Sequence, residues 1–442
     1  MKKIIYSSIL LLALAAMNTG CKKSFPNLNA ASSDEILKTR EGMFSLSIAL
    51  KQYYSTSVEG PLVITTGCTS REIKGISTLA NVLDIELGGS ALPNDNNNLV
   101  NLFANSMRAM VSAENLIDAA PNVLSTDAAT QTGIVAHAKL FKAMAIGAMA
   151  TGFEKCPIKS DKDGKATFVS RVDALNRAVA LLDEASTSIA ATAPSAEFNT
   201  RILGADFKLL DVINAYKARF NLMAGNYAAA KAAAMLVPAT SKSTFLYSAV
   251  SSNPTWSSLG LSPAYRAREN FGLPTAFFDL GDTRLSFYTT SPTFVSGTET
   301  LKTIAGFSAT QIGSYPVYLP DEMRLIKAEC ILRGTGLGTL ADAKTEIDAV
   351  RTQTTGDVFG VYANLPAYSG VVDAPSLLNE VYKQRCSELF LQGLRLEDCR
   401  RFGRPTPPSV PTLSNERTRN FYPYPANERT LNSANVPADP AI

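Results

Sequence analysis

The chain has 442 residues, of which 46% are hydrophobic and 18% charged, and this composition excludes an intrinsically disordered chain. Its 42 basic and 39 acidic residues leave a formal net charge of +3, which excludes the strongly basic surface typical of nucleic-acid binding. A single histidine and the lack of any CxxC pair argue against the common zinc-site patterns. We therefore predict neither a metal nor another cofactor.

The N-terminus has the pattern of an export signal. Lys2 and Lys3 precede an apolar run, Ile4–Ala16, that is too short to span a hydrocarbon core of about 30 Å. A small residue, Gly20, stands directly before Cys21, as in the cleavage site of bacterial lipoproteins. We expect Cys21 to carry the lipid; the alternative is an ordinary secretory signal cleaved near Gly20. Either leader directs the chain out of the cytoplasm, and its removal lowers the net charge to +1.

The remaining chain is predicted to be one helical domain on a tether. The predicted divisions are a lipoprotein signal peptide over 1–20, a lipid-anchored tether over 21–33 and a single domain over 34–442. Apolar periodicity and helix start and stop residues predict helices over 34–54, 99–120, 130–151, 171–190, 205–223, 226–235, 321–333, 339–351 and 376–402. Pro121 is expected to end the second of these helices.

Two stretches interrupt the helical pattern. Residues 55–98 show no helical period, and we predict surface loops there with a β-prone piece at 62–66. Residues 238–315 are rich in Ser, Thr, Pro and Gly and contain the single tryptophan, Trp256. This second stretch is predicted to be a loop-rich insertion between helix pairs.

Two helix pairs have the small-residue seams that antiparallel hairpins need. Helices 205–223 and 226–235 join at Ala224-Gly225, and large and small side chains alternate where the two helices would interlock. These side chains are Tyr216, Phe220, Tyr227, Ala230 and Ala234. A second pair spans 321–333 and 339–351. The predicted fold class is mostly α, with tetratricopeptide-like helical hairpins, a loop-rich insertion and little β structure.

Several residues that could suggest chemistry have plainer interpretations. The glycine-rich segment 334–339 follows a helix and lacks the lysine of a phosphate-binding loop, so we predict a hairpin turn. His137 lies inside a predicted helix and is interpreted as structural. The cysteines after Cys21 are odd in number and widely spaced, and we expect them mainly to be small buried apolar residues, with any pairing left open. They are Cys68, Cys156, Cys330, Cys386 and Cys399.

The C-terminal part of the predicted domain carries a dense charge motif. Within 376–402 the helical spacing predicts the pairs Arg385–Glu388, Arg395–Asp398, Asp398–Arg401 and Glu397–Arg401. We interpret them as a structural network of a partly buried packing helix in which Gly393 lets another backbone approach closely. They are not interpreted as acid/base catalysts.

This motif resembles the C-terminal signature of the SusD/RagB family. The resemblance is carried by Arg385, Glu388, Leu389, Gly393, Arg395, Asp398, Arg401, Phe402 and Gly403, while Gln384 departs from the family's acidic residue. The segment 423–432, the mature start at Cys21 and the order of the helix pairs are also similar to that family, so the likeness spans nearly the whole chain. Asp282-Thr283-Arg284, late in the insertion, matches as well.

The resemblance implies a lipid-anchored outer-membrane protein that is not an enzyme. Such a protein binds a nutrient, an oligosaccharide or a peptide, and delivers it to a SusC-like TonB-dependent transporter. The family is usually exposed on the cell surface, but the basic Lys22-Lys23 leaves the periplasmic face open. Two alternatives remain: a helical-repeat scaffold of the cell envelope that binds no nutrient, and a glycoside hydrolase that uses two of the 39 carboxylates.

The expected ligand-binding face combines side chains from the two non-helical stretches. A sugar needs flat aromatic faces for its C–H surfaces and planar polar side chains for its hydroxyls. The candidates are Arg71, Glu72, Asn81 and Asn96 from the first stretch and Trp256, Tyr265, Arg266 and Arg268 from the second. By the resemblance, the two stretches should meet. One tryptophan is few for a polysaccharide platform, which favours a peptide or a small oligosaccharide.

Overall fold

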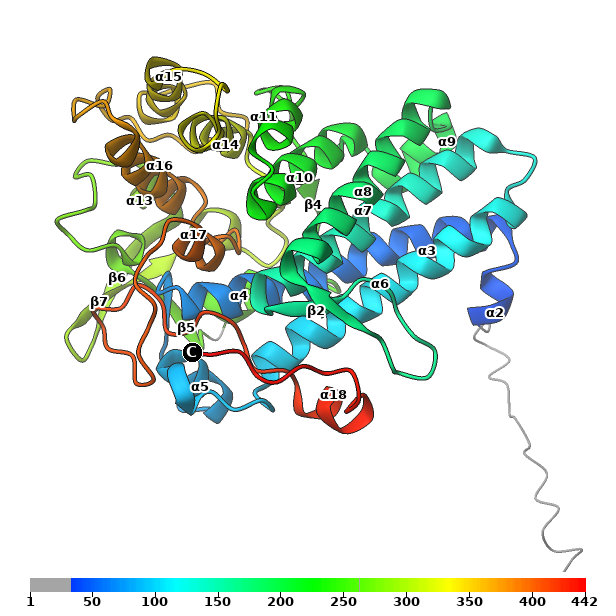
Figure 1. The fold of residues 1–442 in the computed structure, drawn as a ribbon, viewed down its shortest axis with the longest axis horizontal. Coiled ribbons are helices and arrows are strands. Elements are labelled where there is room, and N and C mark those ends of the chain that lie inside the picture. Colours follow the sequence, from blue (N-terminus) through cyan, green and yellow to red (C-terminus); the bar gives the residue numbers. More distant parts are fainter. Residues whose placement is uncertain (1–32, 262) are drawn as a thin grey trace, which may run out of the picture.

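The computed structural model describes residues 33–261 and 263–442, so the predicted leader, tether and Cys21 lie outside the described residues. Helices dominate the described chain, and strands are short (Figure 1). The predicted mostly α class, with tetratricopeptide-like helical hairpins, is confirmed.

The chain begins with a nearly continuous helical segment. Its elements are α2 Ser33–Ile36, α3 Arg40–Tyr53, η1 Tyr54–Val58 and α4 Glu59–Thr69. After the short strand β1 Ile73–Gly75, α5 Ala80–Leu87 and η2 Gly89–Ala91 follow. The prediction of surface loops over 55–98 is therefore wrong for most of that stretch. Thr65 and Thr66, the end of the supposed β-prone piece, are buried inside α4, where tertiary packing overrides the preference of β-branched residues for strands.

Three long helices form one half of the molecule. They are α6 Asn97–Val123, α7 Ala128–Gly152 and α8 Arg171–Ala191, and each packs against the next. Helix α6 continues two residues beyond the expected stop at Pro121. Helix α7 is central, because every residue from Leu140 to Gly152 is buried. Among the described residues, α7 is the one helix long and apolar enough to cross a membrane, but 89% of its apolar window is buried inside the protein, as in a core helix.

The other half is built of helical hairpins at the predicted positions. The pair α10 Leu209–Ala224 and α11 Tyr227–Met235 turns at Gly225, which adopts a left-handed φ of 85°. The pair α14 Pro320–Arg333 and α15 Leu340–Arg351 follows, and α11 packs on α14. The glycine-rich segment 334–339 is the turn of this second hairpin, as predicted. Helices α7 and α10 pack closely at Gly147, a contact that the sequence did not suggest. A Cβ on Gly147 of α7 would lie 2.2 Å from the Phe220 ring of α10.

The predicted helix over 376–402 is broken, which corrects the prediction. It divides into α16 Ala374–Glu388 and α17 Arg395–Arg401. Between them Leu391 and Gly393 adopt positive φ values of 57° and 71°. The Leu391 N–H donates to the Glu72 carboxylate at 3.0 Å instead of to a helical carbonyl. Gly393 thus allows a left-handed turn, in addition to close approach by Leu62, whose Cγ would lie 3.0 Å from an added Cβ.

This break changes the charge pairs. Arg385 pairs with Asp398 at 2.9 Å across the turn, not with Glu388, and Arg395 donates to the Tyr382 hydroxyl instead of to Asp398. The predicted pairs of Arg401 with Asp398 and Glu397 are present, at 2.7 and 3.5 Å.

Strands cluster beside the helical body. A four-stranded sheet has the order β1-β5-β7-β6, with β1 Ile73–Gly75, β5 Tyr265–Arg268, β6 Thr289–Ser296 and β7 Glu299–Ile304. Two-stranded sheets join β2 Lys155–Pro157 to β3 Phe168–Ser170 and β4 Thr244–Phe245 to β8 Tyr315–Pro316. The remaining short elements are α9 Ala196–Phe198, η3 Asn199–Leu203, α12 Pro254–Trp256, η4 Ser257–Leu261, η5 Glu269–Gly272, α13 Arg284–Tyr288, η6 Gly306–Ser308 and α18 Ala426–Leu431.

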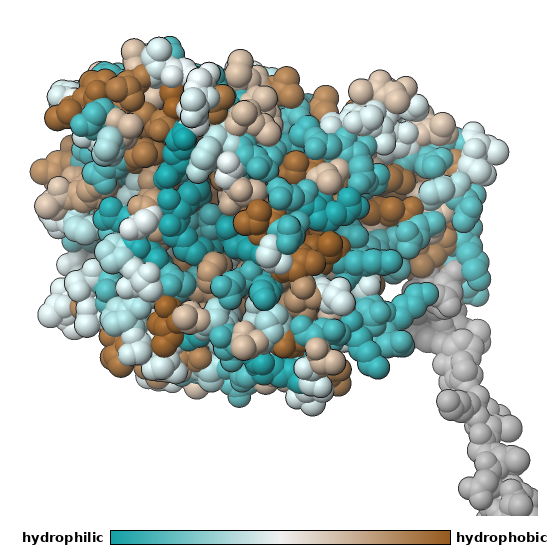
Figure 2. All heavy atoms as spheres, in the orientation of Figure 1, coloured by the Kyte–Doolittle hydropathy of each residue, from teal (hydrophilic) through white to brown (hydrophobic). Residues whose placement is uncertain are grey.

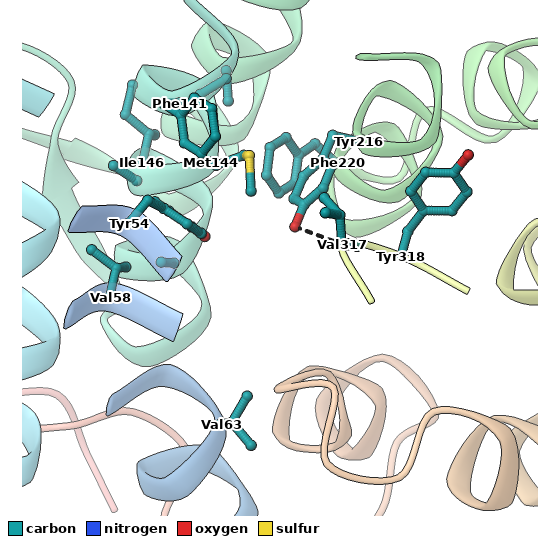
Figure 3. Packing of buried hydrophobic residues seen from close by; sticks show 14 of the residues in the cluster. Tyr54, Val58, Val63, Phe141, Met144, Ile146, Tyr216, Phe220, Val317 and Tyr318 are labelled. Atoms are coloured by element: carbon teal, nitrogen blue, oxygen red, sulfur yellow. Dashed lines mark hydrogen bonds between the residues drawn. The ribbon is translucent and has the colours of Figure 1, made fainter. Parts of the chain in front are cut away.

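A continuous apolar core links the two halves. Figure 3 shows Tyr54 and Phe141 facing Tyr216 and Phe220, whose elements lie far apart in the sequence. The Tyr216 hydroxyl donates to the Val317 carbonyl at 3.2 Å. His137 is fully buried beside Phe141, and burial lowers the pKa of its imidazole. The five described cysteines are buried, as expected, and all five are free.

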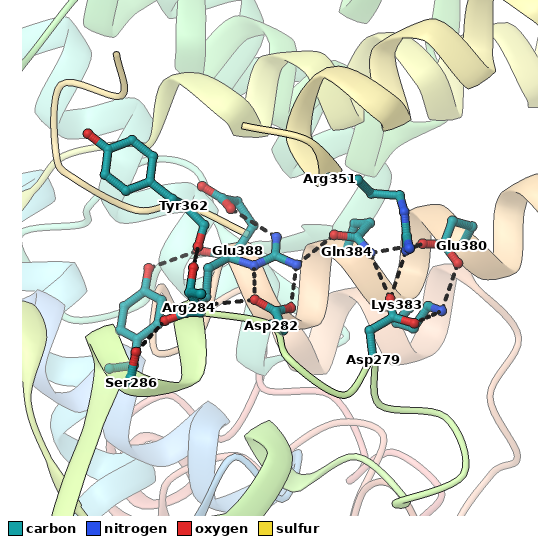
Figure 4. A network of polar contacts seen from close by, with 12 residues as sticks. Asp279, Asp282, Arg284, Ser286, Arg351, Tyr362, Glu380, Lys383, Gln384 and Glu388 are labelled. Carbon is teal, nitrogen blue, oxygen red and sulfur yellow. Dashed lines mark hydrogen bonds and ion pairs between the residues drawn. The ribbon is translucent and has the colours of Figure 1, made fainter. Parts of the chain in front are cut away.

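A buried polar network ties the insertion to α16. The Arg284 guanidinium is fully buried and donates to Asp282 at 2.6 Å, to Glu388 at 3.0 Å and to Gln384 at 2.6 Å (Figure 4). Gln384 continues the network toward Glu380. Breaking such a network leaves a buried charge without its partner, which strongly destabilises the fold. The network therefore fixes the position of the insertion against α16.

Candidate functional site

Strand pairing brings the two candidate stretches together. β1 and β5 are antiparallel, with Lys74 opposite Arg266 and Gly75 opposite Tyr265. The expected meeting of the two stretches is therefore confirmed. Two cavities lie along this junction, and each takes side chains from both sides of it.

The first cavity, which we name the arginine cavity, has a volume of about 440 Å³. It contains the candidates Arg71 and Arg268. Its wall is otherwise formed by Glu269, Asn270, Gly272, Leu273, Pro274, Thr275, Glu299, Thr300, Leu413, Ser414, Asn415 and Glu416. The lining combines charged, amide and hydroxyl groups with the apolar Leu273, Pro274 and Leu413 and has no aromatic ring, so it offers hydrogen bonds and charge but no stacking surface.

Ion pairs hold the arginine side chains in place. Arg71 pairs with Glu86 at 3.0 Å and donates to the Thr412 carbonyl at 3.0 Å. Arg268 pairs with the same Glu86 and with Glu299, and Lys74 pairs with Glu299 as well. Burial lowers the pKa of Arg71, and the neighbouring charge of Arg268 lowers it further.

The backbone around this cavity is strained. Arg71 has a φ of 65°, and the consecutive Asn270 and Phe271 have φ values of 54° and 58°. Gly272 follows with a φ of 71°, and a Cβ there would lie 1.9 Å from the Arg71 carbonyl oxygen. Non-glycine residues held in this region cost about 1–3 kcal/mol each and cluster at functional sites. The strain therefore marks the arginine cavity as a candidate site independently of its charges.

The second cavity, which we name the amide cavity, has a volume of about 340 Å³. It contains the candidates Asn81 and Tyr265. The other lining residues are Gly60, Pro61, Ile64, Leu79, Val82, Asn98, Asn101, Pro254, Ser257, Ser258 and Ala264. None of the lining side chains carries a charge at neutral pH. Amides and hydroxyls alternate with apolar side chains, which suits a ligand with both hydroxyl groups and C–H faces.

The four remaining candidates, Glu72, Asn96, Trp256 and Arg266, line neither cavity. Glu72 is buried and accepts the Leu391 N–H, and the buried Asn96 donates to the Asn81 carbonyl at 3.0 Å. The Arg266 guanidinium lies 3.7 Å from the centre of the Phe294 ring. Trp256 is half-buried, and its neighbours in the chain, Pro254 and Ser257, line the amide cavity.

Sequence reasoning missed several lining residues. Asn98 and Asn101 lie on the first turns of α6, and Asn98 stood within an asparagine run that was assigned to loop. An asparagine run before an apolar helix is a cap signal and could have pointed to this helix start. Residues 413–416 belong to the irregular tail and carried no signal of their own.

The described residues 33–261 and 263–442 contain no group of three or more His, Cys, Asp or Glu side chains that could hold a metal ion. The face shown in Figure 2 is mostly hydrophilic, with small and separate hydrophobic patches.

The fold is similar to that of solved SusD superfamily proteins. Similar solved structures include a SusD superfamily protein from Bacteroides vulgatus, with a TM-score of 0.69 at 12% identity, covering 91% of this chain and 99% of that one. NanU from B. fragilis has a TM-score of 0.68 at 15% identity, covering 93% and 99%. A laminarin-binding SusD-like protein has a TM-score of 0.62 at 14% identity, covering 92% and 100%. The sequence itself matches no family model and no curated protein. The SusD-like resemblance inferred from the motifs is thus confirmed by the fold.

Proposed function

We propose that the protein is a non-enzymatic binding subunit that captures an oligosaccharide and delivers it to a TonB-dependent transporter of the outer membrane. It is anchored on the cell surface through lipid on Cys21. The fold supports this proposal, because solved structures with the same fold are described as SusD-like carbohydrate-binding proteins, including the laminarin-binding one.

The observation that carries the proposal is the composition of the amide cavity. The amides of Asn81 and Asn101 can each donate and accept hydrogen bonds, as sugar hydroxyls require. The Asn98 amide already binds the Asn81 carbonyl, the Asn96 side chain and the Tyr265 hydroxyl. Apolar side chains such as Ile64 and Leu79 offer contacts for C–H groups. A cavity of about 340 Å³ falls in the usual range for small-molecule sites, so it suits one or two sugar units of a longer chain.

The same lining supports a role without catalysis. Glycoside hydrolysis needs a proton donor and a second carboxylate about 5–10 Å apart at the scissile bond. The amide cavity has no carboxylate in its wall, and its ionisable side chain is Tyr265, whose pKa is raised by burial. Bound sugar would therefore meet hydrogen-bonding groups that hold it but no group positioned to cleave it.

Titration calorimetry with neutral oligosaccharides tests the binding function. We expect laminarin-derived oligosaccharides or another neutral glycan to bind, and Asn101→Ala to weaken that binding about tenfold because one hydrogen-bonding group is lost. Asn122→Ala is the matched control, since Asn122 is an exposed asparagine of the same helix α6 and lies outside the cavity. If peptides bind and a broad panel of glycans does not, the oligosaccharide assignment is wrong.

Co-purification tests delivery to a transporter. From detergent-solubilised outer membrane, the intact protein should elute together with a barrel transporter, and Cys21→Ala should release the protein from the membrane fraction. An intact, membrane-bound protein without a transporter and without a ligand would instead support the alternative of a helical-repeat scaffold.

A further inference from the structure

The arginine cavity has a charge balance that a neutral ligand does not explain. Three cations, Arg71, Lys74 and Arg268, share two carboxylates, those of Glu86 and Glu299. All five side chains are at most 17% exposed, so water screens them only partly. The cluster therefore holds one positive charge that no carboxylate within it balances.

The two other carboxylates at the cavity do not supply the missing charge. Glu269 pairs with Lys302 at 3.3 Å, and Glu416 pairs with Arg404. Each of these is a neutral pair, so the cavity and its immediate partners keep an excess of one cation. In addition, the Arg71 Nε is buried and has no hydrogen-bond partner in the described part of the chain.

We propose that the arginine cavity is a second binding site that takes a single carboxylate group of an acidic sugar, such as a uronic acid unit. A carboxylate is the planar anion that guanidinium groups bind best, through charge-assisted hydrogen bonds. It would restore neutrality to the cluster of Arg71, Lys74, Arg268, Glu86 and Glu299.

The rest of the wall favours a sugar acid over a peptide carboxylate. Asn270, Thr275, Thr300, Ser414 and Asn415 surround the arginine side chains with hydroxyl and amide groups. These groups match the hydroxyls of a pyranose ring, and Leu273, Pro274 and Leu413 can contact its C–H groups. The strained backbone at Arg71 and Asn270 holds this arrangement before any ligand arrives, which lowers the cost of binding.

The inference concerns a cavity other than the one that carries the proposed function, so the two can be tested separately. Titration calorimetry would compare trigalacturonate with its methyl ester, and neutral laminarin-derived oligosaccharides would be titrated in parallel. We expect trigalacturonate to bind more tightly than the ester, and we expect added salt to weaken binding of the acid but not of the neutral glycan.

Two substitutions that change the net charge of the cluster in opposite directions distinguish electrostatic recognition from a structural role. Lys74→Gln removes the excess charge without altering the cavity wall, because Lys74 does not line it. It should weaken trigalacturonate binding roughly fivefold to thirtyfold. Glu299→Gln raises the excess to two charges and should strengthen binding by a similar factor. A merely structural role would weaken binding in both variants.

Three results would overturn the inference. The first is equal affinity for acid and ester, or no binding of either. The second is weaker acid binding in both variants. The third is tighter binding of acetyl-dialanine than of trigalacturonate, which would assign the cavity to peptide carboxylates. In each case, the proposed function still holds if the neutral glycan binds. If the neutral glycan fails to bind while trigalacturonate behaves as expected, the proposed function is contradicted and this inference is not.

Discussion

Glu72 is a carboxyl group whose ionisation the fold opposes. Its side chain is 1% exposed, and one carboxylate oxygen accepts the Leu391 N–H at 3.0 Å. The other oxygen is buried without a hydrogen-bond partner in the described residues. Burial raises the pKa of Glu72 from its ordinary value of 4.5 to about 7, although the charge of Arg395 and the Leu391 hydrogen bond act in the opposite direction.

The substitution Glu72→Gln should therefore change how stability depends on pH. Between pH 4.5 and 7 the unfolded chain releases the Glu72 proton while the folded chain keeps it, so the free energy of unfolding of the native protein falls as the pH rises. Each pKa unit corresponds to about 1.4 kcal/mol, which gives up to about 3 kcal/mol over this window. Glutamine cannot ionise and still accepts the Leu391 N–H, so the variant avoids this loss.

Chemical denaturation at about pH 5 and pH 8 measures the effect. The difference in unfolding free energy between Glu72→Gln and the native protein should shift by about 2–3 kcal/mol in favour of the variant at the higher pH. Glu154→Gln is the control, since Glu154 is exposed to water. Equal differences at both pH values for Glu72→Gln would refute the reasoning. Binding of neutral glycan in the amide cavity should be unchanged, because Glu72 does not line that cavity and glutamine keeps the Leu391 hydrogen bond.

Three further substitutions test the packing and the site. Gly393→Ala should lower the unfolding free energy by roughly 1–3 kcal/mol, because φ is 71° and the new Cβ would lie 3.0 Å from Leu62; an unchanged denaturation midpoint would contradict this. Arg284→Met should cost about 3–5 kcal/mol, because Glu388 would stay buried without its cation, and a loss under about 1 kcal/mol would contradict the network's role. Trp256→Ala should weaken glycan binding while leaving the melting temperature unchanged, whereas a large fall in melting temperature would place the indole in the core.

Helix α8 and the turn between α10 and α11 could be predicted from local pattern, because the burial of α8 is periodic and Gly225 is a typical helix stop. Helix α8 was expected over 171–190 and spans Arg171–Ala191, and α10 and α11 meet at the expected Gly225. In these elements the apolar stripe and the start and stop residues are set by residues close together in the chain. A short window of the sequence therefore contains them.

The errors arose where a distant segment decides the local conformation. Helix α4 is buried almost all round, so its sequence shows no amphipathic period to recognise. The turn between α16 and α17 depends on Glu72, which is more than 300 residues away in the chain. The Glu72 carboxylate accepts the Leu391 N–H, which would donate to a backbone carbonyl in a continuous helix. Neither effect is visible in a window of the sequence.

Membership of the candidate site was predicted by residue type, but its division into two cavities was not. Of the residues predicted by type, Arg71 and Arg268 line one cavity, and Asn81 and Tyr265 line another. Which side chains share a cavity follows from the register of β1 on β5, and register is set by contacts that sequence spacing does not contain.

The C-terminal charge motif reaches the arginine cavity through two buried contacts. Glu388 pairs with Arg284 and so fixes the end of α16, and three residues later the Leu391 N–H binds Glu72. Glu72 directly follows Arg71, whose left-handed backbone lies against Gly272 in the cavity wall. A residue of the motif that touches no ligand can therefore shift the guanidinium of Arg71. For this reason, a substitution at Glu388 should impair binding in the arginine cavity more than in the amide cavity, even though its side chain lines neither.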